Sequence, residues 1–143
     1  MQDHPSTTRR RFVSGLAALP LAAGTASAQA PASLPVREAL AAAEAGRLTL
    51  VDIRTPDEWA DTGVPRGARP LDVTGSAFEV RLAGLRLDHP GRPIALIDRS
   101  GAQSSATVRK LAGRGWRDLL AVRDGMLGPA GWLAEKLPVT AYP

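Results

Sequence analysis

One stretch of the sequence decides the fold: Pro93-Ile94-Ala95-Leu96-Ile97-Asp98-Arg99-Ser100-Gly101-Ala102-Gln103-Ser104. Residues 93–98 are apolar up to the aspartate, which is typical of a strand buried on both faces of a parallel sheet. Residues 98–104 form a turn that contains Ser and Gly, and a helical pattern follows over 104–112. A buried strand that leads directly into a helix is the unit from which α/β sheets are built.

Strand and helix patterns alternate on both sides of this stretch. We expect further strands over 48–53, 68–73 and 119–122. We expect helices that begin near Pro35, Thr55, Ser76 and Pro129, of which the second has the capping box Thr55-Pro56-Asp57-Glu58. The alternation predicts a small parallel sheet flanked by helices.

The first 28 residues are predicted to be a targeting segment. A basic stretch, Arg9-Arg10-Arg11, precedes a modestly apolar run of about 15 residues, shorter than the roughly 20 that a membrane-spanning helix needs. Small residues follow at Ala26-Ser27-Ala28. We therefore predict a signal peptide over 1–28 and a periplasmic domain over 29–143, with no membrane anchor after cleavage. The Arg pair before Phe12 resembles a twin-arginine signal, and a general secretory signal stays open as the alternative.

The composition excludes several kinds of site. The chain has no cysteine, so disulfides, thiolate metal sites and thiol nucleophiles are excluded. Only His89 is present beyond residue 28, so a zinc site of the usual Cys/His type cannot be assembled there. The net charge of +4 is spread over arginines interleaved with acidic residues, which indicates a solvated surface and no nucleic-acid partner. We predict no metal and no cofactor.

The turn at residues 98–104 resembles the Cys-x-x-Gly-x-Arg-Ser turn of rhodanese-like domains. Further segments resemble that family in the same order: Leu50-Val51-Asp52-Ile53-Arg54, Pro56-Asp57-Glu58-Trp59, Thr62-Gly63-Val64-Pro65-Arg66-Gly67-Ala68, Gly125-Met126-Leu127-Gly128, Trp132 and Leu137-Pro138-Val139. The resemblance covers residues 34–139. It implies the family's fold and a functional site at this turn.

Two positions of the turn depart from the family pattern. The resemblance places the family's catalytic cysteine at Asp98 and its loop arginine at Gln103. The cysteine carries sulfur as a persulfide, and a carboxylate cannot, so the resemblance implies a domain without sulfurtransferase activity. The residues that shape the turn, Ser100, Gly101 and Ser104, match the pattern.

Asp98 has two interpretations. A strand-to-helix turn aims backbone amides and the helix dipole at one point, which forms a cradle for an anion. We expect the Asp98 carboxylate to fill that cradle itself. The alternative is an aspartyl nucleophile, which needs an activating partner. His89, in a Pro-Gly loop, is expected to face solvent instead.

The other candidates have structural explanations. Ser100 and Ser104 are better explained as a turn former and a helix cap than as nucleophiles, because neither lies in a Gly-x-Ser-x-Gly motif. Asp52 and Arg54 are expected to pair as scaffold. Arg99 either contacts an incoming anion or is solvated. The three tryptophans are expected to be packing anchors.

Two function classes stay open. The first is a binding or regulatory module that recognises a periplasmic protein or a small anion at the Asp98–Ser104 loop, with Asp52, Arg54 and Glu58 in support. The second is an enzyme of altered chemistry at the same loop, such as metal-assisted hydrolysis that depends on Asp98. A residual role in sulfur handling belongs to the second class, but the lack of cysteine argues against it.

Overall fold

The computed structural model describes residues 32–143 of the chain. The predicted signal peptide, residues 1–28, lies outside these described residues. Within the described part, no helix is both long enough and apolar enough to cross a membrane.

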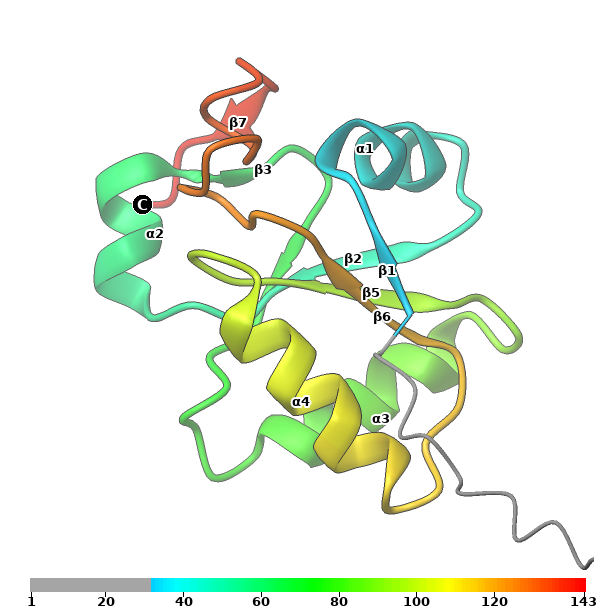
Figure 1. Cartoon of the computed structure of the whole chain (residues 1–143). Coiled ribbons are helices and arrows are strands. Elements are labelled where there is room, and N and C mark those ends of the chain that lie inside the picture. Colours follow the sequence, from blue (N-terminus) through cyan, green and yellow to red (C-terminus); the bar gives the residue numbers. More distant parts are fainter. Residues whose placement is uncertain (1–31) are drawn as a thin grey trace, which may run out of the picture.

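The strand of the opening stretch, β5 (Ile94–Ile97), lies in the middle of a five-stranded sheet (Figure 1). The strand order is β1-β6-β5-β2-β4, and every neighbouring pair is parallel. The remaining strands are β1 (Ser33–Leu34), β2 (Thr49–Asp52), β4 (Arg69–Pro70) and β6 (Leu119–Val122). The predicted parallel α/β sheet is confirmed.

Helices cover both faces of this sheet, so the core has two halves. On one face α1 (Val36–Glu44) packs with Ala95 and Ile97 of the central strand. On the other face α3 (Phe78–Asp88) and α4 (Ala102–Ala112) pack with Ile94 and Leu96 (Figure 1). Alternate residues of β5 enter opposite halves, which explains why the whole strand is apolar.

The short helix α2 (Pro56–Thr62) begins as the capping box predicts. The Thr55 hydroxyl accepts a bond from the Glu58 amide, and the Glu58 carboxylate accepts one from the Thr55 amide at 3.0 Å. These two bonds satisfy amides that have no partner inside the helix. Trp59 of this helix is 4 % exposed, and its ring packs edge-on against Tyr142 with centroids 5.1 Å apart.

The prediction of a last helix that begins near Pro129 is wrong. Residues 129–136 form successive turns. The amide of Trp132 donates to the Gly125 carbonyl at 2.8 Å, and the amide of Leu133 donates to the Met126 carbonyl at 3.1 Å. These bonds reach back to an earlier turn, so they replace the regular i to i−4 pattern of a helix. Trp132 is fully buried all the same, as a packing anchor.

Four short strands differ from the sequence prediction. The loop at Gly63–Gly67 contains β3 (Val64–Pro65), which pairs antiparallel with β7 (Val139–Thr140) in a separate two-stranded sheet. The strand β1 precedes α1, where only a helix start was expected. The strand expected over 68–73 shrinks to β4, because Pro70 has no amide to donate.

Candidate functional site

The turn that links β5 to α4 lies at the carboxyl edge of the sheet, where ligands bind in open α/β folds. The link itself is Asp98–Gly101, because α4 begins at Ala102, two residues before the predicted start; the name Asp98–Ser104 turn is kept for this link together with the first three residues of the helix. Asp98 is 2 % exposed and Ser104 is fully buried, whereas Arg99, Ser100, Ala102 and Gln103 are exposed. The turn therefore has an inner side formed by its two ends and an outer side open to solvent.

The carboxylate of Asp98 occupies the inside of the turn. Its Oδ1 accepts the Gly101 amide at 2.7 Å and the Ser104 hydroxyl at 2.9 Å. Its Oδ2 accepts the Gln103 amide at 2.9 Å. Three donors thus converge on one buried anion at the start of a helix of eleven residues, where the helix dipole also favours negative charge.

Ser104 is not the helix cap that the sequence predicted. The N-cap position of α4 is Gly101, whose φ of +96° suits glycine, and Ser104 lies inside the first turn. Asp98 takes over the capping role from the end of the strand, because it accepts the amide of Gln103 in the first turn. Ser104 instead supplies a hydroxyl to the carboxylate.

A second loop, residues 123–128 after β6, is hydrogen-bonded to the turn. The amide of Met126 donates to the Asp98 carbonyl at 2.9 Å, and the amide of Leu127 donates to the Arg99 carbonyl at 2.8 Å. Gly125 makes this approach possible. Its φ is +54°, and a Cβ at this position would lie 2.4 Å from the Asp98 carbonyl oxygen.

The supporting pair, Asp52 and Arg54, lies at the carboxyl end of the neighbouring strand β2, of which Asp52 is the last residue. Arg54 Nη2 lies 2.7 Å from Asp52 Oδ2, and both side chains are buried. Arg54 also donates to the Thr62 hydroxyl and to the Gly63 carbonyl, each at 2.9 Å. The guanidinium therefore ties the end of β2 to the end of α2, and the predicted scaffold pairing is confirmed.

Glu58 connects this scaffold to the rim of the turn. One of its oxygens completes the capping box, while Oε1 lies 3.7 Å from Nη1 of Arg99. The Arg99 side chain is 67 % exposed, so this ion pair is screened by solvent and weak. Arg99 is held near the turn and still presents its guanidinium to solvent.

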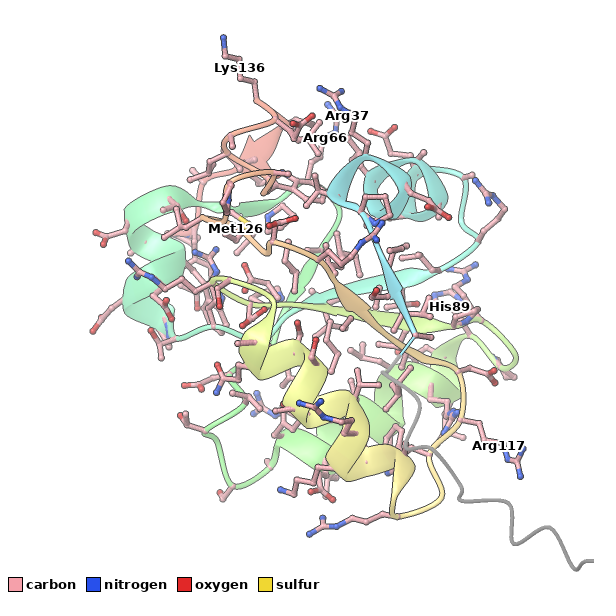
Figure 2. The ribbon with its side chains drawn as sticks, viewed as in Figure 1. Arg37, Arg66, His89, Arg117, Met126 and Lys136 are labelled. Atoms are coloured by element: carbon pink, nitrogen blue, oxygen red, sulfur yellow. The ribbon has the colours of Figure 1, made fainter. Side chains whose placement is uncertain are left out.

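The structure places the remaining candidates away from this chemistry. His89 is exposed, and Figure 2 shows it at the opposite end of the sheet from Met126, which bonds to the turn. Within residues 32–143, the Asp98 carboxylate is contacted by two amides and the Ser104 hydroxyl, and by no acid or base that would activate it as a nucleophile. Among residues 32–143, no three His, Asp or Glu side chains are grouped to hold a metal ion.

Sequence reasoning missed the supporting roles of Gly125, Met126 and Thr62. The first two lie in a segment noted for its family resemblance and for a turn at Asp124-Gly125, and neither signal indicates which part of the chain that turn contacts. Their contact with the turn depends on β6 lying beside β5, which is a tertiary feature. Thr62 gives no local signal, because its hydroxyl meets Arg54 only after α2 folds back.

Comparisons with known proteins agree with this architecture. The family model of the rhodanese-like domain matches residues 35–131. No match is found among curated proteins. Rv0390 from M. tuberculosis is 25 % identical, with a TM-score of 0.58 over 78 % of this chain and 100 % of that chain. The polysulfide-sulfur transferase homodimer from Wolinella succinogenes is 26 % identical, with a TM-score of 0.60 over 77 % of this chain and 78 % of that chain. A rhodanese-related protein from Thermoplasma volcanium is 18 % identical, with a TM-score of 0.58 over 78 % of this chain and 99 % of that chain.

The family model covers most of the chain, and its matched residues include the parallel sheet and the turn that holds Asp98. The likeness to solved structures extends over nearly the full length of two of these proteins. The chain belongs to the rhodanese-like domain family.

Proposed function

We propose that this chain is a rhodanese-like domain without sulfurtransferase activity that binds a partner at the outer side of the Asp98–Ser104 turn. One observation carries the proposal. The inside of the turn is already filled by the chain's own anion, with both oxygens of Asp98 accepting hydrogen bonds. An incoming anionic substrate finds no thiolate to react with, and the three donors that converge inside the turn are already bonded to Asp98.

The chemical argument against sulfur transfer rests on residue types. Sulfur transfer through a persulfide needs a thiol, and the chain has no cysteine. The polysulfide-sulfur transferase from Wolinella succinogenes, at 26 % identity, bears a name that states sulfur transfer. This chain shares its fold and, by this proposal, not its reaction.

The outer side of the turn offers the features of a protein contact. Arg99 presents a guanidinium that is 67 % exposed, and Ser100 and Gln103 present polar side chains. Beside them Leu127 is 43 % exposed, and its amide is bonded to Arg99. A cationic and an apolar side chain on two adjoining loops suit a protein partner with an acidic and an apolar residue. With the predicted export signal, that partner is periplasmic.

A thermal-shift screen with thiosulfate, sulfate, phosphate and divalent metal ions tests the filled turn. For the wild-type chain we expect no shift with any of them and no thiosulfate-dependent sulfur transfer. For Asp98→Ala we expect a shift with the anions, because the substitution frees three donors. A ligand at a hundred times its Kd stabilises by about 2.7 kcal/mol, which raises the Tm by several degrees.

Ser100→Ala is the matched control, because Ser100 lies in the same turn but is exposed and does not contact Asp98. It should behave as wild type. A metal-dependent shift of the wild-type chain that disappears in Asp98→Ala would favour the altered enzyme instead. Sulfur transfer by the wild-type chain would disprove the proposal.

The partner is tested by affinity capture from a periplasmic extract with the wild type and Arg99→Glu. We expect a partner that the variant loses. Arg117→Glu is the control, because Figure 2 shows Arg117 pointing into solvent at a distance from Met126 and the turn it contacts. Equal capture by all three proteins would contradict a role for the turn.

A further inference from the structure

We propose a second binding site, distant from the Asp98 turn, for a small organic anion with an apolar body. It consists of two adjoining hollows of about 420 Å³ and about 140 Å³ between β4, α3 and the loop before β5. The two hollows share Arg69, Leu85 and Asp88 in their walls, and together they are called the groove. A volume of this size suits a small ligand.

The cations of this groove have no carboxylate partner. Arg69, Arg81 and Arg92 line it, and within residues 32–143 none of them lies within 4.0 Å of an acidic oxygen or donates a side-chain hydrogen bond. By contrast Arg37 and Arg114, which are also exposed, each pair with a glutamate. The groove therefore gathers guanidinium groups whose donors are free for a ligand.

The balance of charge favours an anion. Asp88 is the single carboxylate among the lining residues of the two hollows, against three arginines. His89 lies at the same end, and Figure 2 shows it far from Met126, which bonds to the Asp98 turn. A ligand here has no contact with the site of the proposed function, so the two proposals can fail separately.

The floor of the groove is apolar and contains a gap on the helix side. Leu71 is buried and Leu85 is partly buried, so both offer carbon surface to a ligand. Gly84 of α3 lines the larger hollow, and a Cβ at this position would meet nothing within 4 Å. The missing side chain leaves the space that an apolar ligand body would fill.

A partner strand is a poorer occupant than a small molecule. The groove runs along β4, which is an edge strand with a free side. Pro70 has no amide to donate, and β4 has only two residues, so the edge offers little backbone for strand pairing. Side chains therefore recognise the ligand: the guanidinium groups bind its anionic head, and the leucines contact its apolar body.

The test is a titration of the chain with octanoate, followed by ¹H–¹⁵N chemical shifts. We expect saturable shifts at the amides of Leu71 and Leu85 and none at Gly101 or Gln103. Octyl phosphate should give the same pattern, and octanol should bind about two- to five-fold more weakly, because an exposed ion pair contributes about that factor. Arg69→Gln and Arg81→Gln should each weaken octanoate binding by a similar factor.

Gly84→Leu is the decisive variant. Leucine is favoured over glycine in a helix, and the open space accepts its side chain, so the fold is kept while the hollow is filled. We expect octanoate binding to be lost. Ala106→Leu, at an exposed position of α4, is the control and should bind as wild type. Absence of saturable shifts, or equal binding by wild type and Gly84→Leu, would overturn the proposal.

Discussion

Two buried aspartates at the carboxyl edge of the sheet are stabilised in different ways. Asp52, the last residue of β2, is neutralised by a guanidinium 2.7 Å away. Asp98, after β5, is held by two backbone amides and a hydroxyl, and no cation of the described part of the chain lies against its carboxylate. Both are almost completely inaccessible to solvent. The same charged group is thus buried once as half of an ion pair and once as an anion in a loop of donors.

The difference separates scaffold from site. In a buried ion pair each charged group neutralises the other, so neither has charge left to attract a ligand. A loop of amides around an anion keeps its geometry for whichever anion lies inside, since it is built from backbone groups. The environment of Asp98 is therefore that of a ligand site filled by a side chain, and the environment of Asp52 is that of a structural joint.

Breaking the ion pair should have the largest effect. Arg54→Met leaves Asp52 buried without its cation, and we expect the free energy of unfolding to fall by about 3–5 kcal/mol. Urea unfolding followed by tryptophan fluorescence measures this loss. Arg66→Met is the control, because its pair with Glu44 is solvent-exposed and contributes under about 1 kcal/mol. Equal losses in both variants would contradict the structural role of Arg54.

Pushing the second loop away from Asp98 should come next. Gly125→Ala places a Cβ 2.4 Å from the Asp98 carbonyl oxygen at a φ of +54°, and we expect a loss of about 2–4 kcal/mol from the clash and the backbone strain. Gly115→Ala is the control, because its φ is +90° but nothing lies within 4 Å. It should lose only about 1–2 kcal/mol. The same loss in both would show that close approach to the turn is unimportant.

Emptying the turn should have a moderate effect. Asp98→Ala leaves the Gly101 and Gln103 amides and the Ser104 hydroxyl without an acceptor, and we expect a loss of about 1–3 kcal/mol in urea unfolding. Asp98→Asn keeps one acceptor oxygen and should lose less. Added sulfate should recover part of the loss in Asp98→Ala and none in Arg54→Met. If sulfate restored the same stability in both variants, the environments of Asp98 and Asp52 would not differ as an anion site and an ion pair.

Removing the rim contact should have the smallest effect. Arg99→Gln breaks an exposed pair of 3.7 Å with Glu58, and we expect a loss of under about 0.5 kcal/mol. The change in Tm should vanish in high salt, because the wild-type pair is itself screened there. A larger loss would mean that Arg99 holds the turn together, which would weaken its assignment to partner contact.

Much of the fold was predictable because its signals are local. The capping box of α2 depends on Thr55 and Glu58 three residues apart, and β6 was predicted with its observed ends from four apolar residues. Burial of β5 on both faces followed from its unbroken apolar run. The hydrogen bonds of Asp98 were expected, because a turn from a strand directly into a helix aims its backbone amides at the first residue of the turn, which is Asp98 here.

By itself, the sequence determined the parallel α/β class, the family resemblance, the absence of a thiol and the place of Asp98 at the turn. These follow from periodicity, composition and short-range turn chemistry. Only the tertiary structure decided that Ser104 donates to Asp98, that Gly125 braces the turn, that the C-terminal segment forms turns, and that free arginines gather along β4. The physical reason is that each of these depends on groups brought together by the packing of separate elements, and spacing along the chain does not report such contacts.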